Sequence, residues 1–221
     1  MIIRFFLFLL TILPFTALRA QTDALSTKYR EDQFYLSFSM IMQDESIYGF
    51  KQTGFSNNFQ IGFVRDMPLN KKGNIALGLG LGYSFDKVVS NLNLDVDEQN
   101  KLSFFISENG QNRQTYSSLV IPLAFRWRTS SMNKTDFWRI YTGIKYKLNF
   151  NSRFNFPNGD TIKRDFIREQ NSSFYVAVGY NTWNLFFEYD LNSIYLPSLA
   201  LPNEMYPDVR AIRIGLIFFV L

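Results

Sequence analysis

The sequence of 221 residues contains no cysteine and no histidine. Without these residues it has no Ser-His-Asp triad, no cysteine nucleophile, no zinc site of the usual kind and no disulfide framework. We therefore predict a protein that is not an enzyme and that needs no cofactor or metal. Charged residues are also sparse, at 19% of the chain, against the usual quarter.

Aromatic residues are abundant instead, at 18% of the chain, with 24 Phe, 12 Tyr and 3 Trp. Aromatic side chains favour β-strands and interfaces. The length suits one domain, because all-β barrels of this size commonly fold as a single unit.

The first twenty residues have the pattern of a secretory signal peptide. Met1 to Arg4 supplies a positive start, an apolar run extends from Phe5 to Leu13, and small residues precede a cut near Ala20. The apolar run is too short for a membrane anchor, and no cysteine follows it for lipid attachment. We expect residues 1–20 to be removed, residues 21–32 to form a short periplasmic segment, and residues 33–221 to form the folded domain.

The rest of the chain is a series of alternating segments. Apolar and small or polar residues alternate with a period of two, which predicts strands. After the predicted signal, no apolar run of about 18 residues remains for a transmembrane helix. The predicted strands are residues 33–42, 58–66, 75–86, 116–129, 137–150, 173–181, 183–191 and 209–221. Eight strands, an even number, favour a closed antiparallel barrel. Pro122 lies in the middle of a strand, where it removes a ladder hydrogen bond, so a bulge or irregularity is expected there.

Three features favour a transmembrane barrel, with its apolar face outward, over a soluble barrel or sandwich. The glycines within strands all lie on the face opposite the bulky apolar residues, as a crowded interior requires. Short links at 67–74, 130–136 and 181–182 alternate with long ones at 43–57, 87–115, 151–172 and 192–208, as periplasmic turns and outer loops do. The three tryptophans, Trp127, Trp138 and Trp183, lie beside the short links and predict an aromatic girdle at the membrane interface. We therefore expect a bacterial outer-membrane location with both barrel termini in the periplasm.

Charged residues on the inward parity form a candidate lumen cluster. Its members are Arg126, Arg128, Arg139, Lys145, Lys147, Glu188, Asp190 and Arg213. Buried charges are costly unless paired, so we predict salt bridges from Glu188 and Asp190 to some of these cations. An anion-attracting lumen is the alternative. An eight-stranded barrel is narrow enough to be filled by its own side chains, which favours a structural plug over a pore.

One hairpin resembles a known family. The segments Ile121-Pro-Leu-Ala-Phe-Arg-Trp-Arg-Thr-Ser130 and Asp136-Phe-Trp-Arg-Ile-Tyr-Thr-Gly143, with the closing segment 212–221, resemble the PorT family of outer-membrane barrels. The resemblance implies an accessory role in type IX protein secretion, without catalytic residues. Arg126, Arg128 and Arg139 match the hairpin and become candidate structural or contact residues.

The expected partners are outer-membrane lipids and other secretion-system proteins, and the oligomeric state stays open. No nucleic acid is expected, because alternation puts the basic and aromatic residues of the segment 125–128 on opposite faces. The alternative function is a general small barrel for adhesion, membrane integrity or small-molecule passage, without a secretion role.

Overall fold

The computed structural model describes residues 32–44, 48–96, 98, 101–108, 110–129, 138–197, 199 and 208–220. The predicted signal peptide and almost all of the predicted segment 21–32 lie outside these residues. Eight long strands of the described chain form the barrel: β1 (Gln33–Gln43), β2 (Asn57–Pro68), β3 (Ile75–Ser90), β6 (Asn112–Arg128), β7 (Trp138–Asn155), β9 (Gln170–Tyr180), β10 (Trp183–Asp190) and β11 (Ala211–Val220).

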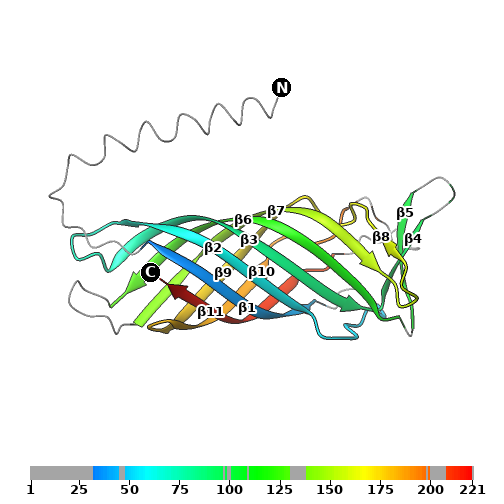
Figure 1. Cartoon of the computed structure of the whole chain (residues 1–221), viewed down its shortest axis with the longest axis horizontal. Coiled ribbons are helices and arrows are strands. Elements are labelled where there is room, and N and C mark those ends of the chain that lie inside the picture. Colours follow the sequence, from blue (N-terminus) through cyan, green and yellow to red (C-terminus); the bar gives the residue numbers. More distant parts are fainter. Residues whose placement is uncertain are drawn as a thin grey trace, which may run out of the picture.

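The sheet closes on itself. Its order is β6-β3-β2-β1-β11-β10-β9-β7, and β6 also pairs with β7. All these pairings are antiparallel, and the first and last strands meet, with Phe34 opposite Val220. The predicted eight-stranded antiparallel barrel is confirmed (Figure 1). Closure leaves no unpaired edge along the barrel wall, which a strand protein needs in hydrocarbon.

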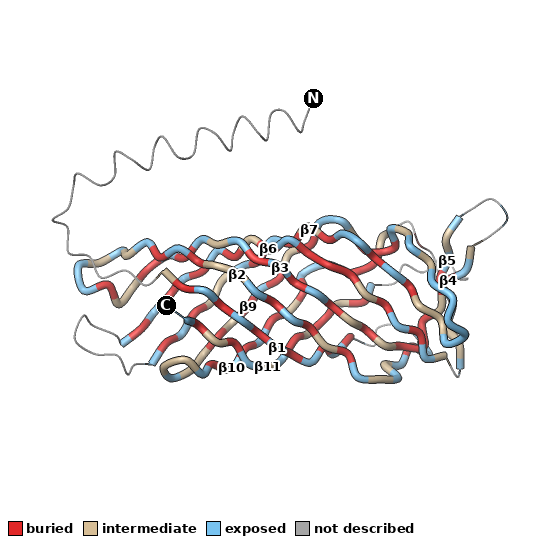
Figure 2. The backbone as a smooth tube through the Cα atoms, viewed as in Figure 1, coloured by how far each residue is buried: buried red, intermediate tan, exposed pale blue. Residues whose placement is uncertain are grey.

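The two faces of the wall are inverted relative to a soluble barrel. Along β1, Phe34 and Phe38 are exposed, whereas Ser37 and Ser39 on either side of Phe38 are buried. Figure 2 shows this alternation of buried and exposed positions along strand after strand. On β10, Leu185 is 71% exposed and Glu188 is fully buried. The apolar residues therefore face outward and the polar residues line the interior.

Glycines lie on the inner face where neighbouring atoms come close. A β-carbon on Gly143 would overlap the carbonyl oxygen of Leu123 on the paired strand. A β-carbon on Gly82 of β3 would overlap the hydroxyl group of Tyr35 from β1, whose ring lies over Gly62 of the strand between them. These contacts explain why small residues occupy the crowded inner face.

The strands continue well beyond the predicted segments at the long-link end. β3 runs to Ser90, β6 begins at Asn112 and β7 ends at Asn155. Within the long links lie three further strands: β4 (Leu92–Val96) pairs with β5 (Leu102–Ile106), and β8 (Thr161–Ile162) pairs with the end of β7. Sequence alternation missed these parts because outward positions such as Lys87 and Arg113 are polar there, so the apolar period fades while backbone pairing continues.

The local irregularity expected at Pro122 is an interruption of the β3–β6 ladder. Gly80 and Leu81 of β3 form no ladder pairs with Pro122 and Ile121 of β6, although the register is the same on both sides. On its other side, Pro122 pairs with Lys145 of β7 in regular register. A bulge lies in β7, where Asn151 and Ser152 together stand opposite the single residue Tyr116 of β6. Asn151 has φ of 56°, a left-handed conformation that asparagine tolerates better than most residues.

The two ends of the barrel differ. Gln33 and Val220 lie at the end that carries the short turns, and the β4–β5 hairpin stands at the opposite end (Figure 1). We call these the short-turn end and the long-loop end. At the long-loop end, the described parts of the long loops and the ends of the barrel strands form one buried apolar cluster, which we call the cap. Its members are Ile41, Phe50, Val88, Leu92, Leu94, Phe104, Tyr116, Phe154, Phe166, Ile167, Ile194, Tyr195, Leu199, Val209 and Ala211.

Candidate functional site

All eight charged residues predicted for the lumen are buried inside the barrel. Each side chain belongs to a residue that is at most 3% exposed. They fall into two groups at different depths, and each group includes an acid that the sequence analysis did not assign.

The central ion cluster comprises three acids and three cations: Asp86, Lys145, Lys147, Glu188, Asp190 and Arg213. Glu188 contacts Lys145 at 2.8 Å, Arg213 at 3.4 Å, and Lys147. Asp190 contacts Lys147 at 3.0 Å and Arg213 at 2.9 Å. Arg213 also contacts Asp86 at 2.8 Å. The formal charges of the cluster cancel. Each buried ion also contacts at least one ion of opposite charge, which offsets the cost of burial.

Neutral groups complete this cluster. The Gln60 amide donates to Glu188 at 3.2 Å and accepts from Lys145 at 2.7 Å. Asn58 donates to Asp86 at 3.0 Å. The Arg213 guanidinium donates to the Tyr116 hydroxyl at 3.2 Å. The cluster is therefore a bonded network that crosses the lumen, because Arg213 joins Asp86 on β3 to Glu188 and Asp190 on β10.

The basal ion cluster lies at the short-turn end. Asp66 on β2 accepts from Arg126 and Arg128 on β6, at 2.7 Å in each case. Arg126 also donates to Gln33 and stacks on Tyr141, 4.2 Å from the ring centre.

Arg139, the third arginine of the predicted hairpin, lies over aromatic rings. Its guanidinium is 5.5 Å from the ring centre of Phe219 and 5.7 Å from that of Tyr141. The three hairpin arginines thus point into the barrel, beside one another on paired strands.

Asp66 and Asp86 are the acids missed by the sequence analysis, which assigned the pairing to Glu188 and Asp190. Both occupy inward positions, on the parity of Gln60 and Gly78. This inward parity was the sequence signal that could have assigned both acids to the lumen. Asp66 and Asp86 are the last inward positions of the predicted segments 58–66 and 75–86, where a polar residue is easily taken for the beginning of a loop.

Aromatic side chains fill the lumen between the ion clusters. Lys145 lies 4.8 Å from the ring centre of Tyr175 and 4.4 Å from that of Phe186. Tyr35, Tyr175 and Phe186 belong to one buried apolar cluster with Phe219. The interior is therefore occupied by side chains in successive layers.

The cap closes the long-loop end. Phe104 of β5 is fully buried, and its ring centre lies 5.0 Å from that of Tyr195 and 6.5 Å from that of Phe166. The Tyr195 hydroxyl donates to Gln114 at 2.7 Å. Burial raises the pKa of Tyr195 to about 12, so the hydroxyl keeps its proton. The cap thus joins the β4–β5 hairpin to the link between β10 and β11.

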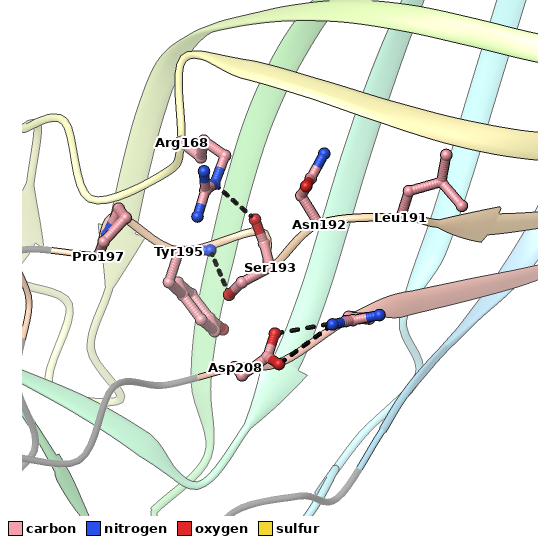
Figure 3. A pocket seen from close by; sticks show the side chains of 8 residues that line it. Arg168, Leu191, Asn192, Ser193, Tyr195, Pro197 and Asp208 are labelled. Atoms are coloured by element: carbon pink, nitrogen blue, oxygen red, sulfur yellow. Dashed lines mark hydrogen bonds and ion pairs between the residues drawn. The ribbon is translucent and has the colours of Figure 1, made fainter.

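A pocket of about 450 Å³ opens beside the cap (Figure 3). Arg168 donates to the Ser193 carbonyl at 3.1 Å, and Arg210 pairs with Asp208 at 3.3 Å. The hydrogen bonds that Arg210 donates to the Asp208 carboxylate raise the pKa of Arg210. Both guanidinium groups therefore already donate hydrogen bonds to oxygen atoms of the chain itself.

The described residues contain no group of three acidic side chains suited to a metal ion. No helix in the described part of the chain is long and apolar enough to span a membrane.

Comparison with known proteins gives one family. The model of the outer membrane protein beta-barrel domain matches residues 19–194, which is most of the chain but stops before β11. The chain belongs to this family. The location of this outer-membrane barrel is accordingly the bacterial outer membrane. The match does not single out the PorT family, so that resemblance stays a prediction.

Two solved structures resemble this outer-membrane barrel, both of Ail, the attachment invasion locus protein of Yersinia pestis. One, in complex with the heparin analogue sucrose octasulfate, is 13% identical and covers 86% of this chain and 97% of its own, with a TM-score of 0.39. The other is 12% identical and covers 87% of this chain and 99% of its own, also with a TM-score of 0.39. The search of curated proteins found no match.

The three tryptophans mark one boundary of the barrel's apolar belt. Trp127, Trp138 and Trp183 are 36%, 56% and 65% exposed and lie at the short-turn end. Trp138 packs against Tyr180 and Trp183 against Phe218. On β3 the belt runs from Ile75 to Phe85, which spans about 25 Å for a tilted strand. This height matches the apolar band of outer-membrane barrels.

Proposed function

We propose that this outer-membrane barrel is a non-conducting protein that acts through the surface of its capped end. Its role is surface contact or support of the cell envelope, and no solute passes through the lumen. The filled interior carries this proposal. A solute entering the barrel would have to displace the cap and then break the ion pairs around Glu188 and Arg213.

The same interior argues against an enzyme. Glu188, Asp190 and Asp86 are fully or almost fully buried and each is held by cations or amides. A catalytic carboxylate has to reach a substrate atom, and these carboxylates are buried in the lumen. The function therefore belongs to the outer surfaces, which the β4–β5 hairpin and the long loops present.

We place the long-loop end outside the cell and both barrel termini in the periplasm. The shortness of the turns at the other end supports this orientation, because outer-membrane barrels have short periplasmic turns and longer outer loops. The tryptophan girdle then lies at the periplasmic interface.

Electrical recording tests the proposal. The purified protein, inserted into planar lipid bilayers, should give no conductance steps, whereas a known porin in the same bilayer gives steps. Regular steps with a reproducible size from the purified barrel would contradict a sealed lumen.

A second candidate function is an accessory role in type IX secretion, and the similarity of the 121–130 and 136–143 segments to the PorT family supports it. The exported proteins of a gene-deletion strain should distinguish the two functions. Export substrates trapped in the cell would favour the secretion role. Normal export with altered attachment or detergent sensitivity would favour the surface role.

A further inference from the structure

Three cations lie together on the outer surface of the barrel, where the apolar belt ends at the long-loop end. They are Lys87 on β3, Arg113 on β6 and Arg153 on β7. These three strands are neighbours in the sheet and run side by side to this end (Figure 1). We call the three residues the basic patch.

Strand register places the basic patch directly beyond the last apolar row. In that row, Ser117 lies between Phe85 and Phe150. In the next row, Thr115 lies between Lys87 and Arg153. Two strand spacings separate the backbones of Lys87 and Arg153 by about 10 Å, so both long side chains can reach one group above Thr115.

Arg113 completes the patch from the following row, where it lies between Val89 and Asn155. Arg113 is two residues from Thr115 on the same strand, so its side chain also points outward. The three cations thus surround Thr115 on the outer face of one sheet.

The bulge in β7 determines the outward direction of Arg153. Phe150 faces outward and Phe154 is fully buried in the cap. The one extra residue of the bulge shifts the alternation, so that Arg153 is exposed between the buried Ser152 and Phe154. The bulge therefore serves both the cap and the basic patch.

No acidic side chain of the described residues neutralises these charges. In the described part of the protein, no carboxylate lies within salt-bridge distance of Lys87, Arg113 or Arg153. The Lys87 ammonium lies over the Phe55 ring, 5.8 Å from its centre, a contact that does not cancel its charge. This differs from the lumen, where Glu188 alone contacts three cations.

We propose that the basic patch binds the phosphate groups of a phosphorylated lipid in the leaflet at the long-loop end. Lipid phosphates lie just outside the hydrocarbon core, at the depth where the apolar row of Phe85 and Phe150 gives way to the patch. Arginine binds phosphate through paired hydrogen bonds, and lysine adds a point charge. Continuity with the lipid-facing belt selects a lipid over a soluble anion. With the orientation proposed above, this is the outer leaflet of the outer membrane.

Lipid binding can be counted on the full chain in detergent micelles by native mass spectrometry. The probes are bisphosphorylated lipid A, the same lipid after phosphate removal, and inorganic phosphate as a competitor. The test variant combines Lys87→Gln, Arg113→Gln and Arg153→Gln. The matched control combines Lys71→Gln, Lys72→Gln and Lys163→Gln, three exposed cations outside the patch.

The test variant should bind bisphosphorylated lipid A about tenfold more weakly than the unchanged protein, because charge-assisted hydrogen bonds are lost. The control variant should bind as the unchanged protein does, and removing the phosphates should weaken binding by a similar factor. Equal binding by the test variant, or equal binding of the dephosphorylated lipid, would overturn the proposal. Competition by inorganic phosphate at lipid concentrations would show a soluble-anion site and would also overturn it.

A variant with Arg113→Lys and Arg153→Lys keeps the charge and checks for misfolding. It should retain most of the lipid binding. If it lost binding as fully as the glutamine variant while both kept the circular dichroism of the unchanged barrel, charge would not explain the effect and the proposal would fail. None of these results depends on whether the protein conducts ions or supports secretion.

Discussion

Buried charges are tolerated in this barrel because each lumen acid contacts at least one cation, and three of the four contact two or more. Glu188 contacts Lys145, Lys147 and Arg213, and Asp66 contacts two arginines. Removing one member of such a network leaves the others buried without compensation, which costs more than the intact pair contributes. The ion clusters are therefore sensitive to single substitutions, although they add little to stability as a whole.

Glu188→Gln should reduce the free energy of unfolding by about 3–5 kcal/mol, the usual cost of breaking a buried ion pair. The glutamine has nearly the same shape, so the loss comes from the charge that Lys145 and Lys147 no longer share. Urea unfolding in lipid vesicles, followed by tryptophan fluorescence, measures the change.

Asp208→Asn is the matched control, because Asp208 pairs with Arg210 outside the lumen and its side chain is 57% exposed. Exposed ion pairs contribute little, so the unfolding midpoint should hardly move. An equal loss of unfolding free energy in the two variants would mean that burial does not determine the cost of breaking an ion pair.

At the scale of strands, the sequence was informative wherever one face meets lipid. Alternation located all eight barrel strands, because period two persists as long as outward residues are apolar. It could not locate β4, β5 or β8, which lie in the loops and pack into the cap through long-range contacts. Nor could it show that Phe104 and Tyr195 meet, since the two are far apart in the chain and no local period records their contact.

The β4–β5 hairpin allows a test of the cap within two adjacent residues. Phe104 is fully buried against Tyr195, whereas Phe105 is 37% exposed on the other face of the strand. Phe104→Ala should loosen the cap, since a buried phenylalanine truncation typically costs about 3–5 kcal/mol. Limited proteolysis should then cut the long loops much faster, while the barrel itself stays resistant. Phe105→Ala should leave the cutting rate unchanged, and faster cutting in that variant would contradict the assigned packing.

For the whole molecule, the main feature is that the two ends of the barrel carry different structures. The short turns, the start of β1 and the end of β11 lie at one end, and the cap and the β4–β5 hairpin lie at the other (Figure 1). The proposed orientation assigns these ends to the periplasm and to the cell surface.

The absence of cysteine makes this orientation directly measurable, because any introduced thiol is unique. Asn158→Cys lies in the exposed turn between β7 and β8, and Lys71→Cys lies in the exposed turn between β2 and β3. A membrane-impermeant maleimide should label the first variant on intact cells and the second only after the outer membrane is permeabilised. The reverse labelling pattern would mean that the long-loop end faces the periplasm, contrary to the proposed orientation.

The central ion cluster also constrains how the protein reaches the membrane. Arg213 lies on the final strand, and its partner Asp86 is 127 residues earlier in the chain. Until β11 pairs with β1, Asp86, Glu188 and Asp190 lack this cation. Hairpins that entered hydrocarbon one at a time would therefore carry unpaired charges into lipid, at high cost. Insertion and closure of the barrel must then proceed together. The last strand has to be synthesised before the first strand can be stably inserted in the bilayer.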